Sequence, residues 1–270
     1  MLRSKQHAPA ISLLLTEPEP DDDWGLGQNH PKAAAAFALG RLGAREYNWE
    51  IAALLNHRLL ETRLAAAGAL ADLEAKEYAG QVVDLLEDLE DPRFDGDRVI
   101  RVLGGFHVRD YAGTIAAFLD HDAAESRGVA AMALAELGAE EYADDIADLL
   151  REEDLHKPGL HAFSLMWAAR ALATLGARDH AEEIAILLKA SDPQLQAEGI
   201  GALAKLDARE YNEQIAAFLN NPLCCWADHP ETGKREYLPL GEVAARVLRN
   251  WGMDPREGRG NSESGRGEQE

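Results

Sequence analysis

The chain has 270 residues, of which 46% are hydrophobic and only 6% are aromatic, and its formal net charge at pH 7 is -21. This length allows a substantial buried core, and the excess of alanine and leucine over β-branched residues favours helix. So negative a surface argues against a nucleic acid partner, because it repels phosphate backbones. It favours a basic protein or peptide, although acidity also serves solubility alone.

The cysteine content and the hydropathy both indicate a soluble, cytoplasmic protein. The only two cysteines are adjacent, Cys224 and Cys225, and neighbouring cysteines rarely bridge each other, so no disulfide framework is expected. The apolar run from Ile11 to Leu15 is too short for a secretory signal. No stretch approaches the ~20 apolar residues that span a bilayer.

From its N-terminus the chain is predicted to begin with a helix from about His7 to Leu15, before an acidic connection from Thr16 to Pro31. Beyond it, an acidic residue followed by an aromatic one recurs at Glu46-Tyr47, Glu77-Tyr78, Asp110-Tyr111, Glu141-Tyr142, Asp179-His180 and Glu210-Tyr211. By subtraction of the residue numbers, the second members of these pairs lie 31, 33, 31, 38 and 31 residues apart. Such self-similarity is typical of repeat proteins.

Apolar columns run through the same six units. Eight residues before the aromatic position stand Leu39, Leu70, Leu103, Leu134, Leu172 and Leu203. Four residues after it stand Ile51, Val82, Ile115, Ile146, Ile184 and Ile215. The spacing predicts two amphipathic helices per unit, and a glycine between them, as at Gly43, Gly138 and Gly176, suits the left-handed residue that ends many helices.

Both ends fit the same pattern. His7 to Leu15 reproduces the second helix of a unit, and Ala244 to Trp251 reproduces the first helix. We therefore expect an all-α protein of about seven antiparallel helix hairpins, with fourteen helices and no strands, over residues 1–254. The polar residues 255–270 are expected to form a disordered tail.

A helix pair of about 31 residues with small residues packed inside resembles the HEAT-repeat family, most closely the short HEAT-like repeats of the phycobilisome-lyase type. This resemblance covers roughly His7 to Asp254. It implies a right-handed α-solenoid, or superhelix, with second helices lining the concave side of a protein-binding scaffold. Deoxyhypusine hydroxylases of the family hold iron with His-Glu pairs, and no His-Glu dipeptide occurs here.

The outward positions of the second helices are rich in carboxylates and contain no basic residue. The binding candidates among them are Trp49, Glu50, Asp84, Asp144, Asp145, Asp148, Glu182 and Glu183. We expect them to form an acidic concave face without basic neighbours that binds a basic partner. An ordinary solvated face explains the same residues equally well.

Three connections are longer than the others, at Thr16 to Pro31, Arg151 to Leu165 and Asn220 to Gly241. Long loops often carry binding residues, so Trp24 and Trp226 are further candidate anchors. A metal site at Cys224, Cys225 and His229 does not match the ligand spacing of zinc sites. No catalytic residue, metal or cofactor is assigned.

The main functional hypothesis is therefore a protein-protein interaction scaffold that binds a basic protein or peptide, and no enzyme activity is assigned to it. The alternative is an accessory lyase or chaperone-like subunit that acts on a chromophore- or cofactor-bearing protein. Adaptation to salt is a third explanation of the acidity, because lysine is scarce beside arginine.

Overall fold

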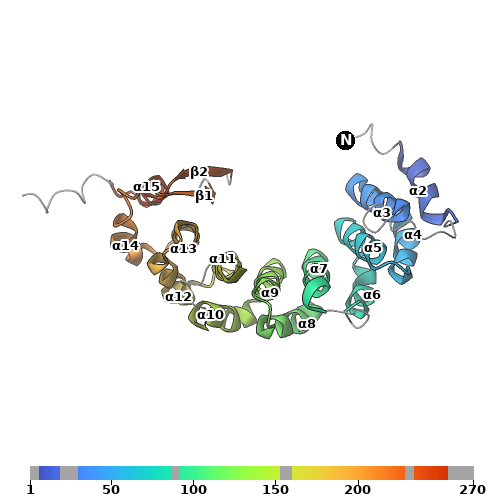
Figure 1. The fold of residues 1–270 in the computed structure, drawn as a ribbon, viewed down its shortest axis with the longest axis horizontal. Coiled ribbons are helices and arrows are strands. Elements are labelled where there is room, and N and C mark those ends of the chain that lie inside the picture. Colours follow the sequence, from blue (N-terminus) through green and yellow to red (C-terminus); the bar gives the residue numbers. More distant parts are fainter. Residues whose placement is uncertain (1–5, 19–29, 87–91, 153–159, 229–233, 255–270) are drawn as a thin grey trace, which may run out of the picture. The chain divides into compact units, whose positions relative to one another are not determined.

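The computed structural model describes residues 6–18, 30–86, 92–152, 160–228 and 234–254. In these residues it contains fourteen α-helices, α2 to α15, and one pair of β-strands (Figure 1). The chain divides into two compact units, Met1–Gly138 and Ala139–Glu270, which we call unit 1 and unit 2. Trp24 and the expected disordered tail lie outside the described residues.

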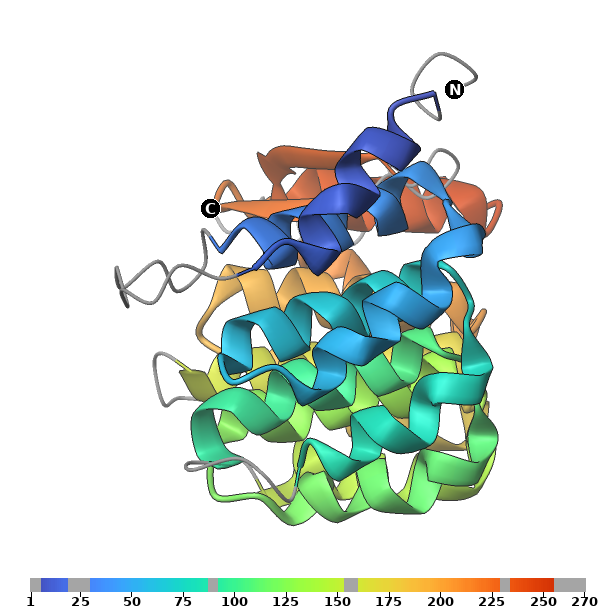
Figure 2. The same ribbon diagram turned by 90° about the vertical axis from the view of Figure 1, so that its right-hand side faces the viewer.

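Unit 1 begins with α2 (Ala8–Thr16) and continues as helix pairs. The first helices of the pairs are α3 (Pro31–Leu42), α5 (Leu60–Asp72), α7 (Pro92–Gly105) and α9 (Ala124–Glu136). The second helices are shorter: α4 (Asn48–Ala53), α6 (Ala79–Asp84) and α8 (Ala112–Ala116). The view turned by 90° shows these helices stacked as successive layers (Figure 2).

Unit 2 repeats the same alternation. Its second helices are α10 (Ala143–Glu152), α12 (Ala181–Ala185) and α14 (Asn212–Ala216), and its first helices are α11 (Leu160–Leu175), α13 (Pro193–Lys205) and α15 (Leu240–Asn250). Between α14 and α15 the chain forms a hairpin of β1 (Cys224–Asp228) and β2 (Arg235–Pro239). The expectation of a chain without strands is therefore wrong at this connection.

A residue in the left-handed conformation ends each first helix. The predicted glycines have positive φ angles, 65° at Gly43, 64° at Gly138 and 71° at Gly176. In three other repeats a non-glycine residue takes this left-handed position, namely Glu74, His107 and Asp207. The acidic–aromatic pair follows in a short 3-10 turn, such as Arg45–Tyr47, before the α-helix begins.

The predicted core columns are confirmed. Leu134, Leu172 and Leu203 have no exposed surface, and the other leucines of that column are at most 1% exposed. The isoleucine and valine column of the second helices is equally buried. This burial accounts for the regular spacing, because each helix must present its apolar stripe to both neighbouring helices.

First helices pack more closely on one another than second helices do. Glycines permit this approach: a Cβ on Gly40 would lie 2.9 Å from the Cα of Ala69, and one on Gly104 would lie 3.0 Å from the Cβ of Ala133. Within each unit the first helices accordingly lie on the inner side of the bend and the second helices on its outer side (Figure 1). The second helices were expected to line the concave side, and this expectation is wrong.

No helix of the described residues is both long and apolar enough to cross a membrane.

Candidate functional site

The acidic residues of unit 2 gather on its second helices, but basic side chains lie beside several of them. Arg151 at the end of α10 pairs with both Asp148 and Glu183. The Nε2 atom of His180 lies 3.4 Å from a carboxylate oxygen of Asp144. The expectation that these carboxylates lack basic neighbours is therefore wrong, because Arg151 follows Asp148 by one helical turn and reaches back to it.

Burial also removes Glu183 from the expected exposed surface, since its side chain is only 15% exposed. Burial raises the pKa of this carboxyl, but hydrogen bonds, chiefly from Arg151, lower it more. The pKa therefore lies below its usual value, and the carboxyl stays ionised to lower pH. Asp145 and Glu182 remain exposed, and no cation among the described residues pairs with them. Among the predicted candidates on the second helices of unit 2, Asp145 and Glu182 are therefore the unpaired carboxylates.

The candidates in unit 1 form a separate group. Trp49 at the start of α4 is 75% exposed. Glu50 is half-buried and Asp84, on α6, is exposed. These residues share the outer row of their own unit, and no described contact joins them to one another.

The hairpin of unit 2 presents two large aromatic side chains to solvent. Trp226 on β1 is directly opposite Tyr237 on β2, and their ring centroids are 5.2 Å apart. Their exposed fractions are 49% and 61%. The reason is the alternation of strand residues: Cys225 and Leu238 point to the buried face, so Trp226 and Tyr237 point to the opposite one.

Gln194, in the first turn of α13, holds the hairpin through its side-chain amide. Its Nε2 donates to the carbonyl oxygen of Trp226 at 2.8 Å, and the amide nitrogen of Trp226 donates to its Oε1 at 2.9 Å. This pair of bonds imitates a neighbouring strand, so it satisfies the outer edge of β1. Asp192 in turn caps α13 by accepting a hydrogen bond from the backbone of Gln194.

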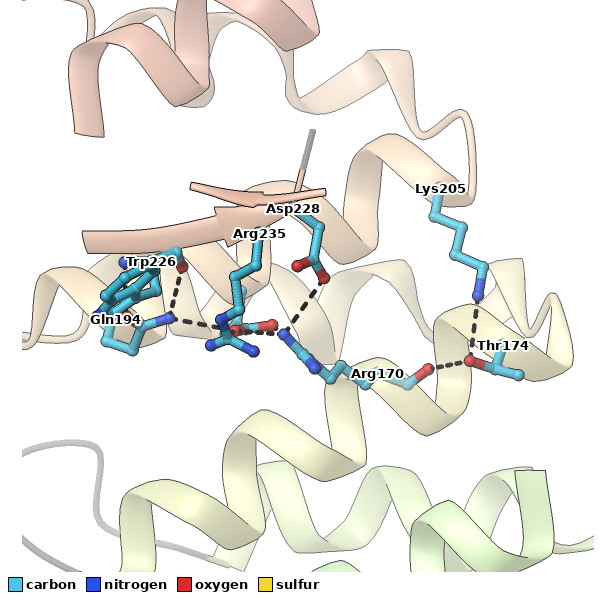
Figure 3. Close-up of polar contacts among 8 residues, drawn as sticks. Arg170, Thr174, Gln194, Lys205, Trp226, Asp228 and Arg235 are labelled. Carbon is cyan, nitrogen blue, oxygen red and sulfur yellow. Dashed lines mark hydrogen bonds and ion pairs between the residues drawn. The ribbon is translucent and has the colours of Figure 1, made fainter. Parts of the chain in front are cut away.

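A buried carboxylate lies beneath the hairpin. Glu198 is 8% exposed and accepts two hydrogen bonds from Arg170 of α11, at 2.7 and 2.8 Å. The hairpin contributes Asp228, 3.5 Å from Arg170, and Arg235, 3.8 Å from Glu198 (Figure 3). The pKa of Arg170 is raised chiefly by its hydrogen bonds to Glu198. Because a buried charge is costly without a partner, this cluster fixes the hairpin on α11 and α13.

The stripe of α11 that carries Arg170 is aromatic. Phe163 and Trp167 precede Arg170 at helical spacing, so the three share one face of the helix. Phe163 is 46% exposed, and its ring lies edge-on to that of Trp167 with centroids 6.3 Å apart. We call the surface that joins Arg170 of α11 to Trp226, Tyr237 and Arg235 of the hairpin the hairpin face.

The two cysteines have different environments. Cys225 is buried, which raises the pKa of its thiol to about 11, with smaller contributions from Cys224, Glu198 and Asp192. Cys224 is exposed. Among the described residues, no cluster of His, Cys, Asp and Glu gathers as metal ligands would, and His229 lies outside them.

An open hollow of about 850 Å³ lies at the C-terminal end of unit 2, lined by residues such as Leu219, Pro239 and Met253. Across it, Arg249 donates to Glu242 at 2.9 Å. No aromatic side chain lines this hollow. The hairpin face is therefore the stronger candidate site.

Sequence reasoning identified Trp226 as a candidate but missed the residues around it. The spacing of Phe163, Trp167 and Arg170 on one helix was a usable signal. Nothing in the sequence indicated the contacts of Gln194 and Glu198, because these contacts depend on how the hairpin folds back over α13.

These features define the class: a protein of stacked helix pairs with an inserted β-hairpin that exposes aromatic residues. No family model matches the chain, and no curated protein matches it. Among solved structures it is similar to the complex of CpcE and CpcF of phycocyanin lyase from Nostoc sp. PCC7120. That similarity has a sequence identity of 23% and a TM-score of 0.48, and it covers 74% of this chain and 76% of that chain.

Proposed function

We propose that the chain is a helical-repeat scaffold that binds another protein through the hairpin face of unit 2. The observation that carries this proposal is the exposed pair of Trp226 and Tyr237 on a firmly held hairpin. Exposing large aromatic rings costs solvation free energy, and aromatic side chains are enriched at the centres of protein interfaces.

Rigid support strengthens this proposal. A side chain that is already ordered loses less entropy on binding, and the backbone of Trp226 is fixed by both hydrogen bonds of Gln194. The buried Glu198 holds Arg170 and approaches Arg235, so the two arginines of the hairpin face are held as well. No cofactor is needed for this function.

The acidic outer row is a second, competing surface for a basic partner. In unit 2 it is reduced to the unpaired Asp145 and Glu182 beside the ion pairs of Arg151. Surface carboxylates of this kind act mainly on the rate of association and are screened by salt. On the described second helices of unit 2 no large exposed aromatic side chain accompanies them as an anchor, whereas Trp49 lies on the outer row of unit 1.

The alternative function, an accessory lyase or chaperone-like subunit, is supported by the resemblance of the short repeats to those of the phycobilisome-lyase type. It also requires a protein partner, in that case one that bears a chromophore or cofactor. Both functions therefore require a protein-binding surface, and they differ in whether the partner is chemically changed.

The test begins by capturing partners from the source cells with the full chain and purifying one that is retained. Its affinity is then measured for the wild type, for the double variant Trp226→Ala/Tyr237→Ala, and for Trp49→Ala as the matched control. We expect the double variant to weaken binding about thirtyfold or more, as removal of two hot-spot residues does, with unchanged circular dichroism.

Three other outcomes contradict parts of this proposal. Equal affinity of the double variant and the wild type refutes the hairpin face. Loss of binding in Asp145→Lys/Glu182→Lys instead assigns the partner to the acidic row. A change in the absorption spectrum of a chromophore-bearing partner on incubation with the chain establishes the alternative function.

A further inference from the structure

The hairpin face is not as acidic as the chain that carries it. Three cations, Arg170, Arg235 and Lys205, lie along α11, α13 and the hairpin in one view (Figure 3). Three carboxylates accompany them: Glu198, which is buried, Asp228, which pairs with Arg170 at 3.5 Å, and Asp192, which caps α13 beside Gln194. Positive and negative charges therefore balance here, although the chain as a whole has a net charge of -21.

Lys205 is the cation of this group that has a neutral partner. It is exposed near the end of α13, and its Nζ donates to the hydroxyl of Thr174 at 3.1 Å. That hydroxyl in turn donates to the carbonyl oxygen of Arg170 at 2.8 Å. No carboxylate of the described residues pairs with Lys205, so the ammonium group is held in place by a neutral acceptor and remains uncompensated.

The aromatic and cationic groups are arranged in a line. Gln194 and Trp226 lie at one end, Arg170 and Arg235 in the middle, and Lys205 with Thr174 at the other end (Figure 3). From position 194 to position 205 the α13 helix rises about 16 Å, at ~1.5 Å per residue. An extended peptide covers that length with about five residues, at ~3.3 Å each.

We propose that the hairpin face, together with Lys205 beside it, binds an extended acidic segment of a protein partner. An apolar side chain of the segment lies on Trp226, and its carboxylates are directed towards Arg235 and Lys205. This inference rests on the proposed function and adds the chemistry of the partner. It reverses the expectation of a basic partner, which was drawn from the net charge of the chain and from its second helices. Guanidinium groups suit carboxylates because their planar donors match the two oxygens.

The charge of the chain makes this proposal testable with short peptides. A chain with a net charge of -21 attracts any basic peptide and repels any acidic one. Specific binding of an acidic peptide must therefore overcome the repulsion by local contacts. Two fluorescein-labelled peptides serve as probes, one with a leucine followed by four glutamates and the other with a leucine followed by four lysines.

Fluorescence anisotropy of both peptides is measured with the full chain at about 0.1 M salt, where the screening length is about 10 Å. We expect the acidic peptide to bind and Lys205→Glu to weaken it about tenfold or more, with a similar loss for Trp226→Ala. The matched control is Lys189→Glu, which makes the same charge change at an exposed lysine after α12. This control should change the affinity less than about twofold, because its charge lies outside the line of contacts.

Failure of this inference can be told apart from failure of the proposed function. If the acidic peptide does not bind, or binds equally to Lys205→Glu and Lys189→Glu, the acidic segment is refuted. Loss of lysine-peptide binding in Trp226→Ala refutes it too, and shows that the hairpin face takes a basic segment. In each case the proposed function still stands if the purified partner loses affinity for Trp226→Ala/Tyr237→Ala.

Discussion

The aromatic residue of each repeat lies against the second helix of the preceding repeat. A Cβ on Gly80 would lie 3.2 Å from the hydroxyl of Tyr111, and His180 approaches Asp144 in the equivalent way. The pKa of Tyr211 is raised first by burial and next by the charge of Glu182, the residue of the preceding repeat that is equivalent to Gly80 and Asp144. These contacts support the interpretation of the aromatic column as packing between repeats.

The two adjacent cysteines should react very differently. Burial raises the pKa of Cys225 to about 11, so its reactive thiolate is scarce at pH 8, whereas Cys224 is exposed. We expect a disulfide reagent such as dithiobis-nitrobenzoate to modify one thiol rapidly at pH 8. The second thiol should react only in denaturant or as the pH rises towards 11.

Single substitutions identify the reacting group. Cys224→Ser should abolish the rapid phase, and Cys225→Ser should leave it unchanged. A rapid phase that persists in Cys224→Ser would contradict the burial of Cys225.

Individual helices approach one another most closely where a glycine removes a side chain. Gly40 of α3 and Gly68 of α5 make a matched pair, since both are helical glycines of unit 1. A Cβ on Gly40 would lie 2.9 Å from the backbone of Ala69, whereas one on Gly68 would have no neighbour within 4 Å. The same substitution should therefore have opposite effects at the two positions.

We expect Gly40→Ala to lower the free energy of unfolding by about 1–3 kcal/mol, because α3 and α5 must move apart. Gly68→Ala should raise it by up to about 1 kcal/mol, because alanine is the better helix former. Urea unfolding followed by circular dichroism measures both. Changes of the same sign in the free energy of unfolding of the two variants would contradict the close packing of α3 on α5.

At the scale of the whole molecule, contacts between repeats are local, so damage to one repeat should not spread evenly. Leu172 has no exposed surface, and α11, which carries it, packs on α10 and α13. Leu172→Ala should cost about 2–5 kcal/mol, the usual range for a truncated core leucine. Hydrogen exchange should accelerate in α11 and α13 and stay unchanged in α3 and α5, because a repeat contacts only its neighbours.

Thr174→Ala is the control on the same helix. Its side chain is exposed, and its loss should change the free energy of unfolding by about 0.5 kcal/mol or less. Faster exchange throughout the chain in Leu172→Ala would mean that all repeats unfold together.

Periodic features of this protein were determined by the sequence alone. Leu172 and its equivalents predicted the buried columns, and Gly43, Gly138 and Gly176 predicted the ends of first helices. These predictions depend only on residues within one repeat, where helical spacing decides which side chains share a face. The left-handed residues Glu74 and His107 were missed. Within a single repeat neither residue type marks this conformation, and only the alignment of the repeats shows that their backbone must be left-handed.

Tertiary structure alone decided which row of helices is the inner one and where the candidate site lies. The close approach at Gly40 depends on two helices, and the pairing of Arg151 with Glu183 also joins two repeats. The hairpin face requires β1 to fold back over α13, where Gln194 meets Trp226 across 32 residues of sequence. Such long-range contacts leave no periodic trace in the sequence, because each is made once and by side chains that no repeat constrains.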